Sequence, residues 1–177
     1  MRFFTTTECV QWCEALKIPL EGNEQKHPVR EFPRLYRLRC KVPSSFTQLL
    51  WFSRCIEHAL WPRQTCLLWV SGWNFFPNDE NWQLYYRFRA TYGDPRLLSE
   101  APGHLCLDFE RDDLATLIQL GIQFGWDSHL ISSGGNGRAF VCHDEWTEIG
   151  FENRAELDVT WHEFVQAELE CSVREPE

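Results

Sequence analysis

The chain has 177 residues, of which 44% are hydrophobic, and its aromatic residues include 13 Phe and 9 Trp. A chain of this length can bury a core of its own without disulfide or metal support, and this apolar content excludes an intrinsically disordered protein. The formal net charge is −9, but residues 1–90 carry 12 Lys or Arg against 8 Asp or Glu, whereas residues 91–177 carry 5 against 18. We therefore expect one globular domain spanning residues 1–177, whose acidic C-terminal half presents a surface to a basic partner.

No apolar run approaches the roughly 20 residues of a membrane-spanning helix, and the first residues lack the long apolar segment of a signal peptide. The eight cysteines are scattered, mostly inside apolar segments with a helix-like or strand-like pattern. They are predicted to be free, buried thiols, and none of their spacings completes a four-ligand zinc site. We expect a cytoplasmic protein with reduced cysteines, without a bound metal or cofactor and without a membrane anchor.

The predicted elements of the first half alternate between helices and strands. A capping box that starts at Thr5 predicts a helix from about Thr7 to Lys17. From Tyr36 to Val42 apolar and basic residues alternate, which is typical of a strand with one solvent-facing side. A helix is expected from Ser45 to Leu60. The continuously apolar run from Thr65 to Val70 is typical of a strand buried on both faces, and we place it at the centre of the sheet.

In the second half the clearest pattern is an amphipathic helix from Asp112 to Phe124, with Leu117 on its buried side. The glycine-rich residues 134–137 permit a tight turn and predict a β-hairpin between His129–Ser132 and Arg138–Cys142. The other predicted elements are a helix around Trp82 to Arg89, strands at His104–Phe109 and Trp146–Phe151, and a last helix that includes Leu157 to Val165. Together these elements predict an α+β fold with a mixed sheet of about five or six strands packed against several helices.

The sharpest chemical cluster is His143-Asp144-Glu145. It would supply a metal ligand and a general base, especially if His104 or His129 came near it in the fold. Neighbouring residues of an extended segment point to opposite faces, however, so these side chains do not converge unaided. Two interpretations stay open, a metal-dependent site and a turn at the exit of the hairpin in which Asp144 and Glu145 are solvated.

A basic strand face is formed by Arg37, Arg39 and Lys41, and Arg30 and Arg34 add to its charge. Such a face can contact phosphates, but the acidic remainder of the chain repels nucleic acid at long range. Binding of nucleic acid is therefore disfavoured, and a solvated strand face is the simpler interpretation.

The aromatic residues Trp73, Phe75 and Phe76 lie among turn-forming residues rather than in a regular apolar period. Filling of the core by two of them is the default interpretation, and exposure of some of these rings as anchors of an interface is the hypothesis on which the predicted function depends. The predicted binding residues are these three aromatics together with Asp144, Glu145 and Glu148.

Three short motifs carry a resemblance to other proteins. They are Ala101-Pro102-Gly103-His104, Phe124-Gly125-Trp126-Asp127 and Cys142-His143-Asp144-Glu145-Trp146. In these motifs the chain looks like small uncharacterised bacterial proteins, and in size and acidity it is similar to immunity proteins of bacterial toxin systems. The resemblance implies a non-catalytic protein-interaction domain, an immunity-like inhibitor that binds a basic partner. The alternative is a small metal-dependent hydrolase or ligand-binding enzyme that uses His104, His143, Asp144 and Glu145.

Overall fold

The structure is a computed structural model of the chain, and it describes residues 1–22, 26–60, 64–73, 79–134 and 137–177, without the side chains of residues 79–82. Its described residues form an α+β domain around a sheet with the strand order β1-β6-β5-β7-β8-β9-β4-β10. These strands are β1 (Arg2–Phe4), β4 (Tyr36–Lys41), β5 (Thr65–Gly72), β6 (Gly103–Leu107), β7 (Asp127–Ser132), β8 (Gly137–Cys142), β9 (Trp146–Phe151) and β10 (Cys171–Arg174). A separate two-stranded sheet joins β2 (Leu20–Glu21) to β3 (His27–Pro28). The helices are α1 (Thr6–Ala15), α2 (Phe46–Ala59), α3 (Asp79–Ala90), α4 (Arg111–Gln123) and α5 (Arg154–Gln166).

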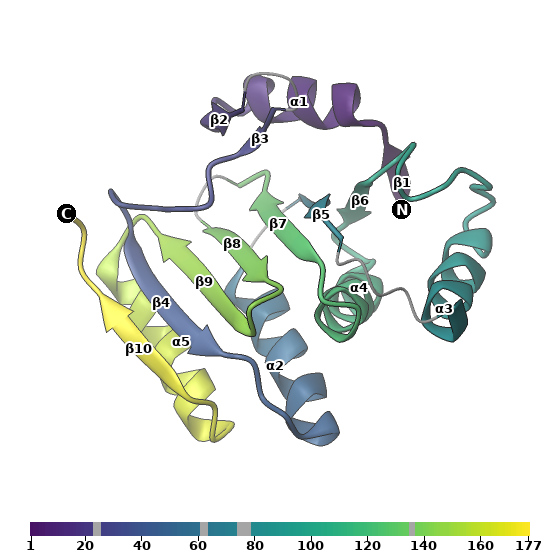
Figure 1. The fold of residues 1–177 in the computed structure, drawn as a ribbon. Helices are drawn as coiled ribbons and strands as arrows, with labels where there is room; N and C mark the ends of the chain where they lie inside the picture. The colour runs from purple at the N-terminus through teal and green to yellow at the C-terminus, as the bar shows by residue number, and fades with distance from the viewer. Residues whose placement is uncertain (23–25, 61–63, 74–78, 135–136) are drawn as a thin grey trace.

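Helices α2, α4 and α5 cover one face of the sheet, and the main hydrophobic core lies between them and the strands (Figure 1). α2 packs against both α4 and α5. Leu68 of β5 and Leu130 of β7 point into this core, where Phe52 of α2 and Leu117 of α4 are also buried. Burial of an apolar side chain of this size contributes about 1.5–3 kcal/mol, so this layer is the main source of stability.

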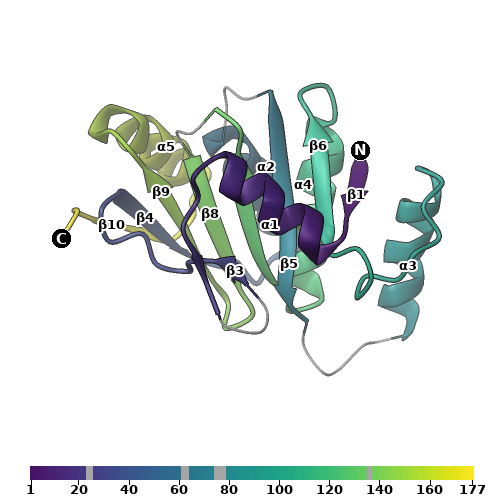
Figure 2. The same cartoon turned by 90° about the horizontal axis from the view of Figure 1, so that it is seen from above.

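Helix α1 lies on the opposite face of the sheet (Figure 2). Its predicted capping box is present, because the Thr5 hydroxyl accepts a hydrogen bond from the backbone N–H of Glu8 and the Glu8 carboxylate accepts one from the backbone N–H of Thr5 at 2.7 Å. Cys9 and Cys13 share the buried side of α1 and pack in a second core with Trp69 of β5. Burial raises the pKa of both thiols, so they act here as small apolar side chains.

The predicted elements and the structure agree closely for the long elements. The expected helices coincide with α1, α2, α4 and α5 to within a few residues, and β5 lies inside the sheet with a neighbour on each side. The sheet itself differs from the prediction, because all its described pairs are antiparallel rather than mixed, and eight strands take part rather than five or six. The strands β1 and β10 have three and four residues, which is too short for an alternating pattern to be recognised.

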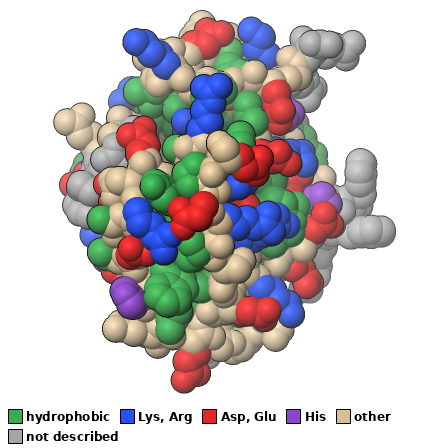
Figure 3. All heavy atoms as spheres, turned by 90° about the vertical axis from the view of Figure 1, so that its left-hand side faces the viewer, with side chains coloured by type: hydrophobic (Ala, Val, Ile, Leu, Met, Phe, Trp, Pro, Cys, Tyr) green, Lys and Arg blue, Asp and Glu red, His purple; other side chains and the backbone are tan. Residues whose placement is uncertain are grey.

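The basic and the acidic half of the chain lie side by side in the sheet. β4, from the basic half, lies between β9 and β10, which both come from the acidic half. Arg39 of β4 lies 3.8 Å from Glu148 of β9, and Lys41 lies 3.9 Å from Glu170 beside β10. Figure 3 shows Lys and Arg side chains interspersed with Asp and Glu on the side of the molecule where β10 lies. On this side the C-terminal half therefore does not form the separate acidic surface that its composition suggested.

All eight cysteines lie within the described residues and are free, as predicted, and six of them are buried. Among the described helices, none combines the length and the apolar character that crossing a bilayer requires.

Candidate functional site

The four residues of the predicted metal-dependent site are not brought together. His104 lies on β6 opposite Leu68 of β5, a residue of the main core, and so faces the helix-covered side of the sheet. His143 follows β8 and contacts Asp127 at the start of β7. Two strands, β5 and β7, separate β6 from β8. The four predicted residues therefore do not form a single site, because His104 lies away from the other three.

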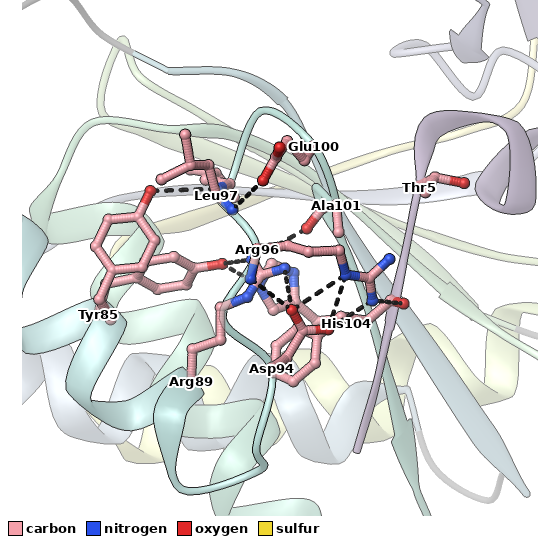
Figure 4. A network of polar contacts seen from close by, with 12 residues as sticks. Thr5, Tyr85, Arg89, Asp94, Arg96, Leu97, Glu100, Ala101 and His104 are labelled. Atoms are coloured by element: carbon pink, nitrogen blue, oxygen red, sulfur yellow. Dashed lines mark hydrogen bonds and ion pairs between the residues drawn. The ribbon is translucent and has the colours of Figure 1, made fainter.

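His104 belongs instead to a buried polar network between α3 and the sheet (Figure 4). Its Nε2 lies 2.7 Å from the Tyr85 hydroxyl, and Arg89 donates to that hydroxyl at 2.7 Å and to the carbonyl oxygen of Ala101 at 3.1 Å. Burial lowers the pKa of His104 to about 3 and raises the pKa of Tyr85 well above its ordinary value. Both rings therefore stay uncharged around the buried guanidinium, whose charge is offset by Asp94 at 3.5 Å.

The network continues to the edge of the sheet. Arg96 donates to the Asp94 carboxylate and, at 2.9 Å, to the carbonyl oxygen of Phe3 in β1. Hydrogen bonds from Arg96 lower the pKa of Asp94 to about 2, so this carboxylate stays ionised. These contacts tie the segment after α3 to the first strand, which is a structural role rather than a catalytic one.

A second polar cluster lies where β7 begins and β8 ends. We call Arg30, Asp127, Cys142 and His143 the β7–β8 cluster. Asp127 Oδ1 accepts hydrogen bonds from the backbone N–H of His143 at 3.0 Å and from its Nδ1 at 2.8 Å, while Asp127 Oδ2 lies 3.3 Å from the Arg30 guanidinium. One donor atom from each of Asp127, Cys142 and His143 lies within 4.8 Å of the other two. The hairpin thus assembles an oxygen, a sulfur and a nitrogen ligand at one point.

The β7–β8 cluster lies on the face of the sheet that α1 partly covers. Leu130 of β7 points into the main core, whereas Ile131 packs in the core beneath α1. Because side chains alternate along a strand, Asp127 and His129 point to the same face as Ile131. This face is opposite to the one that carries His104.

The electrostatics of the cluster are those of a buried anion held by neighbouring cations. Asp127 is 5% exposed, and its hydrogen bond raises the pKa of His143, whose ring is partly exposed. Burial raises the pKa of the Cys142 thiol. A thiol with a raised pKa is a poor nucleophile, so the cluster does not have the properties of a cysteine hydrolase site. Its donor set is instead one that suits a divalent cation.

His129 lies on the same face as Asp127 but serves another purpose. Its ring packs against His27 and Phe140, with centroid distances of 5.9 Å and 4.8 Å. Burial lowers the pKa of His129 to about 3, and its Nε2 has no hydrogen-bond partner within the described part of the chain. His129 is therefore a neutral packing residue, and burying its Nε2 without a hydrogen bond costs folding free energy.

Sequence reasoning missed Asp127 and Cys142 as neighbours of His143. The predicted hairpin could have revealed this, because its two strands pair Ser128 with Val141, and Asp127 and Cys142 are the next residues along these strands. Spacing along the chain alone could not reveal it, since the ligand atoms converge only after the two strands pair.

The predicted binding residues are dispersed over the molecule. Trp73, just after β5, is 38% exposed, and Phe75 and Phe76 lie outside the described residues. Asp144 and Glu145 are exposed in the turn between β8 and β9, where Glu145 has φ of 63°. The interpretation of this segment as a solvated hairpin turn thus agrees with the structure.

Glu148 needs a correction, because it is 4% exposed and does not lie on the surface. It points to the same face of the sheet as Arg39 of the neighbouring β4, opposite which it lies in the register. Burial raises the pKa of its carboxyl group. Alternation along β9 placed this side chain inside the molecule, so Glu148 cannot steer a partner in the way that an exposed carboxylate does.

A groove of about 860 Å³ lies over α2, bounded by the start of α4 and the end of α5. We call it the α2 groove. Its charged lining comprises Glu57, Asp112, Glu163, Glu168, Arg54 and Arg111, with His58 beside them. Trp51 lines the groove and is 58% exposed. Of the predicted binding residues that the structure describes, Trp73, Asp144, Glu145 and Glu148, none lines this groove, so this surface was found only from the fold.

A comparison of the chain with protein-family models, with curated proteins and with solved structures finds no match in any of the three. The function is therefore argued from the geometry of these sites.

Proposed function

We propose that the chain is a non-catalytic protein-interaction domain that binds a basic segment of a protein partner in the α2 groove. The observation that carries the proposal is Trp51, an aromatic side chain that is more than half exposed within a groove. Tryptophan is enriched among the residues that dominate binding energy at interfaces, because it buries a large area with few rotatable bonds.

The apolar surface of α2 continues beyond the groove. Phe46 and Leu50, one turn apart, are 70% and 46% exposed. Trp51 follows Leu50 directly but lies further round the helix, whereas the side of α2 that carries Leu49, Phe52 and Ile56 is buried in the main core. Singly exposed apolar residues are common, but neighbouring ones on successive turns suggest a surface that a partner covers.

The charge of the groove suggests the chemistry of that partner. Four carboxylates line it against two guanidinium groups. Both guanidinium groups are paired with carboxylates of the groove, Arg54 with Asp112 and Arg111 with Glu57. The two remaining carboxylates are Glu163, which contacts His58 at 2.8 Å, and Glu168. The excess of carboxylates favours a segment that carries Lys or Arg beside its apolar residues. A basic amphipathic helix is the simplest segment of this kind.

This proposal keeps the class of function expected from the sequence, an immunity-like inhibitor of a basic partner. It replaces the binding surface predicted from the sequence by the α2 groove. The enzyme alternative loses its support, because it needs His104 beside His143. An inhibitor of this type would act by covering a basic surface of its partner, so the contact itself would be the activity.

Replacing Trp51 by alanine is expected to accelerate dissociation of the partner about 30-fold, the effect of losing roughly 2 kcal/mol at an interface anchor. Trp73→Ala is the matched control, because it removes the exposed tryptophan of the surface predicted from the sequence. The partner is captured from the native host with the wild-type chain, and the kinetics of both variants are then measured on the purified complex. If Trp73→Ala accelerated dissociation and Trp51→Ala did not, the interface would lie outside the α2 groove.

Charge reversal of Glu163 and Glu168 tests the basic character of the partner. The double variant is expected to associate about tenfold more slowly at low salt, because exposed carboxylates mainly steer the encounter, and to approach the wild-type rate at high salt. An unchanged association rate at low salt would contradict a basic partner even if Trp51 proved to be the anchor.

A further inference from the structure

The β7–β8 cluster has a fourth donor that neither the strand pairing nor the proposed function requires. Asp144 Oδ1 lies 3.4 Å from His143 Nε2, and Asp144 Oδ2 lies 3.9 Å from Cys142 Sγ. Asp127, Cys142 and His143 already lie within 4.8 Å of one another. Two carboxylates, one thiol and one imidazole are thus gathered at the exit of the hairpin.

Three of these side chains, Asp127, Cys142 and His143, have the composition of a zinc site. Zn²⁺ binds thiolate sulfur at about 2.3 Å and imidazole nitrogen or carboxylate oxygen at about 2.0–2.2 Å in tetrahedral geometry, which separates neighbouring ligand atoms by roughly 3–4 Å. One ligand atom from each of the three lies within 4.8 Å of the other two, so a modest adjustment of the side chains brings them to these separations. We propose that Asp127, Cys142 and His143 bind one zinc-type divalent cation, with the exposed Asp144 beside them.

The surroundings of Asp127 fit the role of a metal ligand. Its Oδ1 faces His143, while its Oδ2 lies 3.3 Å from Arg30. A carboxylate that binds a metal through one oxygen commonly accepts a hydrogen bond on the other, which fixes its orientation. Arg30 is itself held by the sheet face, since its guanidinium lies over the Phe140 ring at 5.2 Å.

The cation can reach the site from solvent, because the side chains of His143 and Asp144 are 43% and 71% exposed while Asp127 lies beneath them. Three protein ligands leave the fourth tetrahedral position to water. The bound cation would join the start of β7 to the turn after β8. The soft thiolate selects Zn²⁺ or Co²⁺ over Mg²⁺ and Ca²⁺, which prefer oxygen ligands.

The site is independent of the proposed function. The α2 groove lies over the helix layer, whereas the β7–β8 cluster lies on the opposite face of the sheet. Loss of metal binding would leave the protein interaction intact, and the reverse also holds. The proposal departs from the expectation based on cysteine spacing, which considered cysteine pairs and not a single thiol completed by a hairpin.

The test is titration of the reduced, metal-depleted full chain with Co²⁺ and then Zn²⁺. We expect one equivalent of Co²⁺ to bind with a thiolate-to-cobalt charge-transfer band, and Zn²⁺ to displace it. Zinc at a hundredfold excess over its Kd should raise Tm by about 5 °C or more. Cys142→Ser should abolish the charge-transfer band, and His143→Gln should weaken binding at least about tenfold.

The double variant Cys55→Ser/His58→Ala is the matched control, because it removes a thiol and an imidazole one turn apart on α2 and should bind as the wild type does. Absence of stoichiometric binding by the wild type would overturn the proposal. So would a charge-transfer band that survives Cys142→Ser, or full zinc affinity in His143→Gln. The His143 side chain is 43% exposed, so this variant is expected to fold and its loss of affinity can be interpreted directly.

Discussion

Replacing Leu117 by alanine is expected to lower the free energy of unfolding by about 2–5 kcal/mol. Leu117 is 1% exposed and lies on the inner side of α4, in the core that α2, α4 and α5 form with the sheet. The change removes apolar contacts and leaves a cavity that the surrounding side chains fill only in part. For a domain of ordinary stability this is a large fraction of the total, so the variant should unfold at a clearly lower urea concentration.

Thr116→Ala is the matched control for this measurement. Thr116 is the preceding residue of α4 and is exposed, and its hydroxyl only donates to the carbonyl oxygen of Asp112 one turn earlier. Its replacement should change the free energy of unfolding by less than about 0.5 kcal/mol. A loss well below 1 kcal/mol for Leu117→Ala would contradict the packing of α4 on the sheet.

Acidification from pH 7.5 to pH 5 is expected to destabilise the protein by about 4 kcal/mol through two buried histidines. Burial lowers the pKa of both His104 and His129 to about 3, against about 6.5 in the unfolded chain. The folded state therefore binds fewer protons than the unfolded state between these values. Stability is fully present above pH 6.5 and is lost as the pH falls, by about 2 kcal/mol for each histidine at pH 5.

His129→Phe separates the two contributions. The phenyl ring can keep the contacts with His27 and Phe140, and it does not titrate, so the loss between pH 7.5 and pH 5 should fall to about half. His143 acts with the opposite sign, because its hydrogen bond with Asp127 raises its pKa and stabilises the folded state at low pH. Urea unfolding at the two pH values measures each effect, and the same pH dependence in His129→Phe and wild type would show that His129 is not buried in a neutral form.

The buried histidines also show why the predicted metal site could not be recognised as wrong from the sequence. His104 and His143 were both candidates because imidazole binds metals, but the choice between a ligand and a core histidine depends on burial and on neighbours. His104 is surrounded by Tyr85 and Arg89 of α3, which lie 15 to 19 residues away along the chain. The His104 Nε2 already contacts the Tyr85 hydroxyl at 2.7 Å, and nothing in the local sequence reveals this contact.

Periodicity was sufficient for every long element. The repeat of apolar residues predicted α2 and α4, the capping box predicted the start of α1, and the unbroken apolar run of β5 predicted its place inside the sheet. These features are local, because a helix or a buried strand shows its environment in the spacing of its own side chains. The absence of disulfides also followed from where the cysteines lie in these patterns.

The pairing of the strands and everything that depends on it were decided by the tertiary structure. Insertion of β4 between β9 and β10 brought Arg39 and Lys41 beside carboxylates of the acidic half, and Glu148 is buried there. The register of β7 with β8 gathered Asp127, Cys142 and His143, and the packing of α2 between α4 and α5 left Trp51 in an acidic groove. The spacing of side chains indicates which face of an element is buried, but not which element covers it. Contacts between distant segments form only when the chain folds.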